Sequence, residues 1–220
     1  LAADLSQQIE AQTHDRLFVL ADANTARLCW PLVADEPCME QAELITIPAG
    51  DDNKSIESLA AVWEELSQRG ATRRSLLVNI GGGMLTDLGG FAAATFKRGI
   101  PFINVPTTLL AMVDASTGGK TGINFAGLKN EVGVFRDAQA VIINMAFLQT
   151  LDAKNLRSGY AEMLKHGLIA EGSHLAKLLK YNFDDLSQLG GMIAESVAVK
   201  ERVVTEDPFE HSIRKALNLG

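Results

Sequence analysis

Short apolar runs recur along the first 150 residues of the chain, and helical or polar segments separate them. Each run is five or six residues long and rich in Leu, Ile and Val, as buried strands are. The predicted strands span residues 17–21, 43–47, 75–80, 101–105 and 140–144. An amphipathic pattern over residues 54–69, stopped at Gly70, predicts a helix between the second and third strands. This alternation predicts an α/β fold with a Rossmann-like parallel sheet covered on both faces.

The pattern changes at about Leu151, after which the segments have helical patterns. The predicted helices span residues 155–170, 173–181, 184–206 and 209–219. We therefore predict an α/β domain over residues 1–150, followed by an all-helical domain over residues 151–220 that is incomplete. The cleft between the two domains is the predicted functional site.

A glycine turn, Gly81-Gly82-Gly83, follows the third predicted strand and opens a predicted helix. Such a turn exposes backbone N–H groups at the positive end of a helix dipole, where a pyrophosphate can bind. Three glycines alone are weak evidence, and their spacing matches neither the dinucleotide fingerprint nor the P-loop. The next strand runs into Thr107 and Thr108, so two successive strand ends deliver polar groups to the same edge of the sheet.

Residues 114–130 combine an acid, paired glycines, two lysines and an amide. Glycines allow the backbone to approach a ligand, Lys120 and Lys129 supply positive charge, and Asn130 can donate and accept hydrogen bonds. This composition favours a site for a phosphorylated or carboxylated small molecule. A solvated glycine-rich loop with incidental charges is the alternative that the segment alone leaves open.

Glu162, Lys165 and His166 share one face of a predicted helix, because residues three and four apart are neighbours there. A glutamate and a histidine at this spacing can bind a metal ion together. The alternative is that His166 only packs against nearby residues, and we do not include it among the predicted ligands. The remaining histidines, predicted to lie at the surface or at helix ends, are His14, His174 and His211.

Composition and charge narrow the class of partner. The net charge of −7 and the pI near 5.1 argue against nucleic acid, which needs a broad basic face. Cys29 and Cys38 match no zinc or redox spacing and indicate a reducing compartment. The sequence has no long apolar segment and no basic and apolar start typical of a signal peptide. We therefore predict a cytoplasmic protein that does not enter a membrane.

Several of these motifs together resemble the 3-dehydroquinate synthase family. The motifs that carry the resemblance are Gly81-Gly82-Gly83 with Asp87, Phe91-Ala-Ala-Ala-Thr95 with Arg98-Gly99, Val105-Pro-Thr-Thr-Leu-Leu110, residues 114–120, Lys129-Asn130, Ala161-Glu162 with Lys165, Lys200, and Arg214 with Asn218. The resemblance covers nearly all of residues 17–220 and keeps the motif spacing from Asp87 to Asn218. Residues 1–24 depart from it, because the family's usual opening strand pair is absent there.

The resemblance implies a carbon–oxygen lyase that converts 3-deoxy-D-arabino-heptulosonate 7-phosphate to 3-dehydroquinate and phosphate in the shikimate route to chorismate and the aromatic amino acids. The family uses NAD, which takes a hydride from a substrate alcohol and returns it after phosphate is eliminated. It also uses a divalent metal, zinc or cobalt, which polarises that alcohol. The residues implied to bind the substrate's phosphate and carboxylate are Lys120, Asn130, Lys165, Lys200, Arg214 and Asn218.

The resemblance also implies a cofactor site, a metal ligand and an assembly. The residues implied to bind NAD are Asp22, Asn24, Asp51, Lys54, Gly82, Gly83, Asp87, Thr107, Thr108, Asp114, Lys129 and Thr150. Glu162 is implied to be one of three protein ligands of the metal, and the other two are histidines. Arg98 is implied to reach the substrate phosphate in the neighbouring subunit of a homodimer. At position 51 the family commonly has Glu, and Asp51 shortens that side chain by one methylene group.

The two histidine ligands of the family correspond to no histidine of this chain. The family motif that begins with Arg214 and Asn218 continues into Gly-His-Thr-x-Gly-His, and its first histidine would follow Gly220. We therefore expect the chain to be a fragment of a longer protein, with a poor metal site and little turnover of its own.

Three other functions remain open. A related sugar-phosphate cyclase would keep the NAD and metal residues but act on a different sugar phosphate. A metal-dependent polyol dehydrogenase would release NADH and would need fewer anion-binding residues. A nucleotide-binding module without catalysis is the non-enzymatic alternative.

Overall fold

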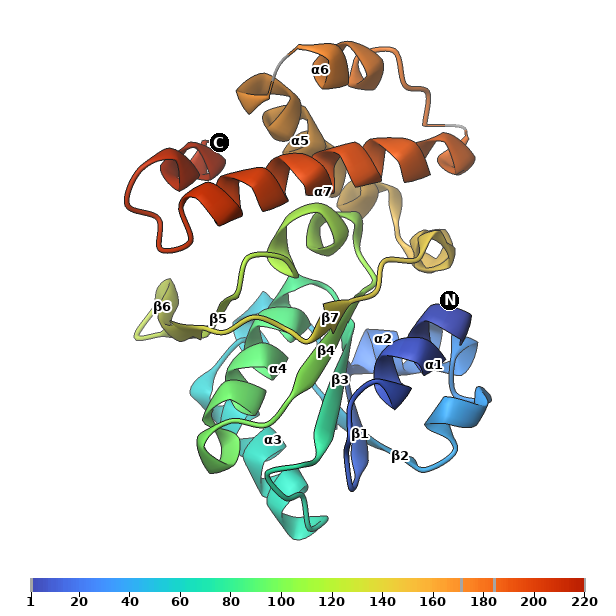
Figure 1. The fold of residues 1–220 in the computed structure, drawn as a ribbon, viewed down its shortest axis with the longest axis vertical. Coiled ribbons are helices and arrows are strands. Elements are labelled where there is room, and N and C mark those ends of the chain that lie inside the picture. Colours follow the sequence, from blue (N-terminus) through green and yellow to red (C-terminus); the bar gives the residue numbers. More distant parts are fainter. Residues whose placement is uncertain (1, 171, 184, 220) are drawn as a thin grey trace.

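A parallel sheet of five strands, in the order β2-β1-β3-β4-β7, forms the centre of the computed structural model (Figure 1). The strands are β1 (Leu17–Asp22), β2 (Ala42–Ile47), β3 (Leu76–Gly81), β4 (Phe102–Pro106) and β7 (Ala140–Val141). The structure describes residues 2–170, 172–183 and 185–219. The α/β fold with a parallel sheet that the sequence predicts is confirmed.

Helices cover both faces of this sheet because its central strands are apolar on both faces. They are α1 (Ala2–Glu10), α2 (Ala23–Leu28), α3 (Ile56–Gln68) and α4 (Gly83–Thr95). Every residue of β1 and β3 is buried, as continuous apolar runs predict. Phe18 and Leu20 belong to the core shared with α3 and α4, whereas Leu17 and Val19 belong to the core shared with α1.

An antiparallel hairpin, β5 (Lys120–Phe125) and β6 (Leu128–Phe135), lies beside α4 and outside the sheet (Figure 1). The hairpin is not among the predicted elements, because the segment has the composition of a glycine-rich loop. Gly122 and Gly133 pair across the hairpin, and a Cβ atom on Gly122 would lie 3.0 Å from the Cα atom of Gly133. This close approach of two backbones accounts for glycine at both positions.

Three α-helices are described after Leu151. They are α5 (Ala153–Ile169), α6 (Ser173–Leu178) and α7 (Leu189–Glu206). α7 lies across the carboxyl ends of the strands and packs against a π-helical turn, Ala111–Ala115, that follows β4 (Figure 1). Three predicted helices are shorter than expected: α6 ends at Leu178, α7 begins at Leu189, and the last predicted helix is reduced to a 3-10 helix, Ile213–Asn218. Asp184, the first residue of the predicted helix 184–206, lies outside the described residues.

Short 3-10 turns connect these elements. They are Trp30–Leu32, Pro37–Met39, Asp51–Asn53, Phe96–Arg98, Met145–Thr150 and Leu186–Gln188. Helices α1 and α2 are additions to the predicted set, and β7 is only two residues long. Within the described part of the chain, no helix combines the length and the apolar character that crossing a membrane requires.

Candidate active site

The first turn of α4 lies at the carboxyl end of β3 and leaves its backbone N–H groups uncapped. Gly82 is the N-terminal cap, and no side chain there accepts a hydrogen bond from the helix. A Cβ atom on Gly82 would lie 3.0 Å from Cγ2 of Thr108, and one on Gly83 would lie 3.0 Å from Cβ of Ala115. Glycine therefore keeps the turn open at the positive end of the helix, where an anion can approach. Three predicted cofactor residues, Gly82, Gly83 and Thr108, meet at this turn.

Three further predicted cofactor residues gather around Cys29, near the ends of β1 and β4. Burial raises the pKa of the Cys29 thiol, and Thr150, Thr107 and Asp22 all lie close enough to act on it. The hydroxyl oxygen of Thr150 is 3.7 Å from the Cys29 sulfur. Asp22 caps α2, and its carboxylate accepts a hydrogen bond of 2.8 Å from the backbone N–H of Asn24. These groups continue the row of polar side chains along the strand ends.

Lys54 connects the predicted cofactor residue Asp87 to the predicted substrate residue Asn130. Its buried ammonium group lies 2.5 Å from Oδ2 of Asp87 and also donates to Oδ1 of Asn130. Burial raises the pKa of Asp87 to about 6, although the Lys54 ammonium opposes the shift. A carboxyl group that titrates near neutral pH beside a cavity is typical of a functional site.

Asp51 and Lys129, two other predicted cofactor residues, form an ion pair of 2.8 Å at the surface, with side chains 52% and 77% exposed. The hairpin is also held by Asn124, whose backbone N–H donates to the carbonyl oxygen of Lys54 at 2.8 Å. The hairpin is therefore fastened to the segment that carries Lys54.

A cavity of about 510 Å³ lies between the hairpin, the π-helical turn and the helical half of the chain. The predicted substrate residues that line it are Lys120, Asn130, Lys200, Arg214 and Asn218. The predicted cofactor residues Asp87 and Asp114 line it as well. Its size is that of a site for a small molecule. Folding therefore brings together, on one cavity, residues that the sequence distributes over both halves of the chain.

Glu210 lines the same cavity and is not among the predicted site residues. Its Oε2 atom is 2.6 Å from Nζ of Lys120, and its Oε1 atom accepts a hydrogen bond of 2.6 Å from the amide of Asn218. The Lys120 ammonium holds the pKa of Glu210 below its ordinary value, although burial opposes it. The signal that could have identified Glu210 is its position four residues before Arg214, in a segment already assigned to substrate binding.

Arg214 is buried and held by backbone groups. Its guanidinium donates to the carbonyl oxygen of Pro208 at 2.5 Å and to that of Gly118 at 2.7 Å. The loop that carries it is ordered by Asp207, whose carboxylate accepts hydrogen bonds from the backbone N–H groups of His211, Ser212 and Arg214. Arg214 therefore joins the glycine turn before β5 to the end of the helical half.

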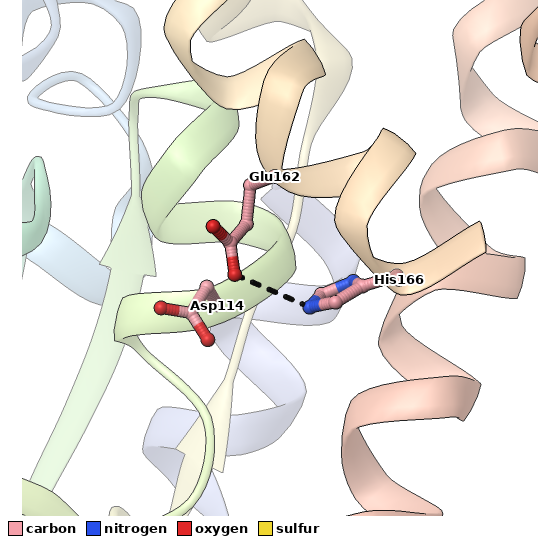
Figure 2. A group of neighbouring side chains, drawn as sticks. All are labelled: Asp114, Glu162 and His166. Carbon is pink, nitrogen blue, oxygen red and sulfur yellow. Dashed lines mark ion pairs between the residues drawn. The ribbon is translucent and has the colours of Figure 1, made fainter. Parts of the chain in front are cut away.

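Asp114, Glu162 and His166 form an acid–histidine cluster where the π-helical turn meets α5 (Figure 2). One ligand atom from each residue lies within 4.8 Å of the others, and Nε2 of His166 is 3.4 Å from Oε1 of Glu162. Burial opposes ionisation of Glu162, but His166 and Lys165 outweigh it and hold the pKa of Glu162 below its ordinary value. Two carboxylates and an imidazole are donors that zinc and cobalt accept, so these residues fit a divalent metal.

The cluster adds two donors to the single ligand that the sequence analysis assigns. Glu162 is that ligand, Asp114 is predicted only for NAD, and His166 is left out of the predicted set. The spacing of Glu162 and His166 is the signal for the histidine. For Asp114 the residue pattern gives no such signal, although π-helical turns are frequent at functional sites.

Two predicted substrate residues do not line the cavity. The ammonium of Lys165 lies 2.6 Å from Glu162 and donates to the carbonyl oxygen of Leu217, which does line it, so Lys165 adjoins the site. Arg98 ends the turn after α4 and is outside the cavity that the described residues form. Its predicted role in a neighbouring subunit remains a prediction.

His174 lies in the first turn of α6, which agrees with the predicted position at the surface or a helix end, and its side chain is buried. Its Nδ1 atom is 2.9 Å from a carboxylate oxygen of Glu195, and its Nε2 atom is 2.8 Å from the hydroxyl of Ser196. The physical reason is that α6 packs its first turn against α7, and no local pattern marks that contact.

Comparisons with known proteins agree on one family. A family model described as 3-dehydroquinate synthase N-terminal matches residues 44–158, and one described as 3-dehydroquinate synthase C-terminal matches residues 159–220. The 3-dehydroquinate synthase of Parabacteroides distasonis is 54% identical over 100% of this chain, which spans 63% of that protein's length.

Solved structures of similar fold include two cyclases. The 2-epi-5-epi-valiolone synthase of Streptomyces hygroscopicus, with NAD⁺ and Zn²⁺ bound, is 29% identical with a TM-score of 0.78, over 95% of this chain and 60% of that chain. A 2-deoxy-scyllo-inosose synthase complexed with carbaglucose-6-phosphate, NAD⁺ and Co²⁺ is 23% identical with a TM-score of 0.87, over 99% of this chain and 62% of that chain. The second similarity shows the fold alone.

Proposed function

The chain belongs to the 3-dehydroquinate synthase family, and from that premise we propose that it carries the site that converts 3-deoxy-D-arabino-heptulosonate 7-phosphate to 3-dehydroquinate and phosphate. The observation that carries the proposal is the gathering of the predicted anion-binding residues on one cavity beside the α4 turn. The chain spans about two thirds of its Parabacteroides relative, so the activity of the whole protein is part of the proposal.

NAD and a divalent metal are the cofactors of this proposal. The row of polar groups along the strand ends would hold NAD, with Asp22 and Asn24 towards the adenine and the α4 turn at the pyrophosphate. Glu162 would bind the metal, with Asp114 and His166 beside it. When bound, NAD accepts and returns a hydride, and the metal polarises the alcohol that is oxidised.

The chain's own contribution is to bind and orient the substrate. Lys120, Lys200 and Arg214 supply positive charge for a phosphate and a carboxylate, and Arg214 is already fixed by backbone carbonyl groups. Asn130 and Asn218 can donate to the hydroxyl and carbonyl oxygens between those anions. Holding a flexible sugar acid in one conformation removes much of the entropic part of the barrier.

The organisation of the protein is also part of the proposal. Residues 1–150 would bind NAD and residues 151–220 would supply the metal ligand and substrate contacts, as the cavity between the two halves supports. The protein would act as a cytoplasmic homodimer in which Arg98 reaches the partner's cavity.

Calorimetric titration of NAD⁺ into the chain tests the cofactor half of the proposal. We expect saturable binding without substrate. A variant that fills the turn, Gly82→Val, should lose that binding, while Gly190→Ala, where no atom lies within 4 Å of the added Cβ and no positive φ strains the backbone, should keep it. Absence of NAD⁺ binding in the folded chain would contradict the cofactor assignment.

Phosphate release tests the reaction. The assay uses the chain and a chimera that joins it to the rest of the Parabacteroides distasonis relative, each with NAD⁺ and a divalent cation. We expect phosphate release by the chimera and much slower release by the chain, with no net formation of NADH. A chimera that is folded and binds NAD⁺ but releases no phosphate would contradict the proposed reaction.

A related cyclase activity is the second candidate, because a 2-epi-5-epi-valiolone synthase is 29% identical with nearly the whole chain superposed. The same chimera, tested on a panel of sugar phosphates and sugar-acid phosphates, distinguishes the two. We expect the sugar acid to react fastest, since the cavity gathers two lysines and an arginine for two anionic groups. Net NADH formation would instead identify a polyol dehydrogenase.

A further inference from the structure

Each carboxylate of the acid–histidine cluster is paired with a lysine that belongs to the proposed substrate site. The ammonium of Lys165 lies 2.6 Å from Oε1 of Glu162, and that of Lys200 donates to Oδ1 of Asp114. The lysine side chains are 16% and 8% exposed, so neither pair is a loose surface contact. Two positive charges therefore lie against the two acidic members of the cluster.

His166 gives a second, independent indication that the cluster is a cation site. The residue is fully buried, and neither ring nitrogen has a hydrogen-bond partner among the described residues. Its Nε2 atom faces Glu162, as Figure 2 shows. A buried polar group without a partner is costly, and a cation bound between the imidazole and the carboxylates would remove that cost.

We propose that, without a divalent cation, the ammonium groups of Lys165 and Lys200 supply the positive charge that neutralises the carboxylates of this cluster. Binding of a divalent cation then moves both ammonium groups towards the cavity. The part of this inference that concerns the substrate rests on the proposed function. A divalent ion coordinated by Glu162 and Asp114 repels the two ammonium groups and takes over their carboxylates. The flexible four-carbon stem of lysine allows each group to move.

The cavity adjoins both lysines and can receive the displaced charges. Lys200 already lines it, and Lys165 donates to the carbonyl oxygen of Leu217, which forms part of its wall. The cation would thereby prepare the anion-binding side chains before the substrate arrives.

If the two lysines have a purely structural role, removing one should change the cation affinity in the direction opposite to the one proposed. If Lys165 and Lys200 only orient the carboxylates, removing either lysine leaves the ligands less well placed, and cation affinity falls. If the ammonium groups compete with the cation, removing either one raises cation affinity. The sign of the change decides between the two roles.

Titration with Co²⁺ or Zn²⁺ alone, followed by calorimetry and by Co²⁺ absorbance, measures that sign. We expect Lys165→Met and Lys200→Met each to tighten cation binding on the order of tenfold. Lys120→Met is the matched control, because Lys120 lines the same cavity but pairs with Glu210 instead of the cluster. It should change the affinity less than about twofold. Unchanged or weaker binding in both methionine variants of the cluster lysines would overturn the proposal.

The position of the cation is tested by changing the donors. Glu162→Gln, Asp114→Asn and His166→Gln should each weaken Co²⁺ binding at least about tenfold and alter its absorbance, while circular dichroism confirms that the variants are folded. Asp114→Asn keeps the shape of the side chain, so it serves if His166→Gln does not fold. Binding of the wild-type strength in every folded variant of Asp114 and His166 would contradict the cluster.

Inorganic phosphate tests the movement of the lysines. We expect the chain to bind phosphate more tightly when the cation is present, and the double variant Lys165→Met/Lys200→Met to lose that enhancement. An enhancement of equal size in the double variant would mean that the cation alone attracts the anion, and the proposed release would be wrong. None of these measurements uses the sugar substrate or turnover, so their failure leaves the proposed reaction standing, and the failure of that reaction leaves them unaffected.

Discussion

The carboxyl group of Asp87 is held between the buried ammonium of Lys54 and the cavity, and its pKa of about 6 has a consequence for stability. The ordinary value is 3.8, so between pH 4 and pH 6 the folded protein binds more protons at this group than the unfolded chain does. The contribution of Asp87 to the free energy of unfolding therefore falls as pH rises through this interval, by roughly 3 kcal/mol at most.

The variant Asp87→Asn should remove that part of the pH dependence. We expect the unfolding free energy of the wild type to fall relative to that of the variant as pH rises from 4 to 6. The difference between the two proteins should stay constant above about pH 7. Urea unfolding at a series of pH values measures it. Parallel profiles for the two proteins would show that Asp87 titrates normally.

Asp207 shows the opposite behaviour. Burial favours its neutral form, but backbone N–H groups of Ser212, His211 and Arg214 outweigh burial and lower the pKa of Asp207 to about 2. Its contribution to stability is therefore present above about pH 4 and is lost as pH falls towards 2.

We expect Asp207→Ala to lower the Tm at pH 7 by roughly 2–4 °C and to weaken phosphate binding, because the loop that carries Glu210 and Arg214 loses its hydrogen bonds. The difference from wild type should shrink as the pH approaches 2. Thermal unfolding by circular dichroism measures both, and Glu206→Ala, an exposed acid next to it, is the control. Equal melting of wild type and Asp207→Ala at pH 7 would contradict the role of this carboxylate.

At the scale of elements, the contact between α5 and the segment before the π-helical turn sets the geometry of the acid–histidine cluster. Gly159 of α5 touches this segment so closely that an added Cβ atom would lie 2.6 Å from Cβ of Leu109. Glu162 is one helical turn further along α5, and Asp114 lies in the π-helical turn. The distance between the two carboxylates therefore depends on a glycine that has no polar atom in its side chain.

Gly159→Ala should push α5 away from this turn, reduce stability by about 1–3 kcal/mol and weaken Co²⁺ binding. Gly190→Ala is the matched control, since this helical glycine of α7 has no atom within 4 Å of an added Cβ. The control should gain up to about 1 kcal/mol, because alanine restricts the unfolded chain and favours helix. Chemical unfolding and cation titration of both variants give the comparison. Wild-type cation affinity in Gly159→Ala would contradict the role of Gly159 in positioning the cluster.

The strands that the sequence predicts well are those that are buried on both faces. β1 and β3 are buried throughout, so a predominantly apolar run is a sufficient signal even with Asn79 inside β3. β6 is exposed along its whole length, and its glycine and lysine residues are typical of a loop. Only its pairing with β5 therefore identifies it as a strand. The apolar run 140–144 looks like a full strand, but only its first two residues pair with β4 at the edge of the sheet.

At the scale of the whole molecule, an apolar surface on the hairpin is consistent with the proposed homodimer. Phe125, Leu128 and Val132 are each at least 40% exposed. Soluble proteins seldom expose several large apolar side chains on one element without a partner.

We expect Leu128→Glu to shift the protein from dimer to monomer without changing its Tm beyond the loss of association, because the side chain is exposed in the single chain. Leu179→Glu, an exposed leucine after α6, is the control and should leave the assembly unchanged. Sedimentation velocity over a range of concentrations measures the result. A wild-type chain that stays monomeric at high concentration would contradict the role of this surface, as would a Leu128→Glu dimer.

The site could be predicted only in part, because its contacts join distant parts of the chain. Spacing along a helix is enough to place Glu162 beside His166. No local pattern indicates that Lys200 pairs with Asp114, which is 86 residues earlier, or that Glu210 pairs with Lys120. Resemblance to a family supplied the residues of the cavity, and the fold supplied the ion pairs that connect them.

Arg214 reaches the carbonyl oxygen of Gly118 across 96 residues of chain, and this span bears on the order of events during synthesis. A ribosome delivers the strands, the α4 turn and the hairpin well before it delivers this arginine. The α/β half can therefore collapse before Arg214 reaches Gly118, and glycine can adopt the positive φ angles of positions 118 and 119 at little cost without that contact. The anion-binding wall of the cavity can therefore be completed only after Arg214 has been synthesised.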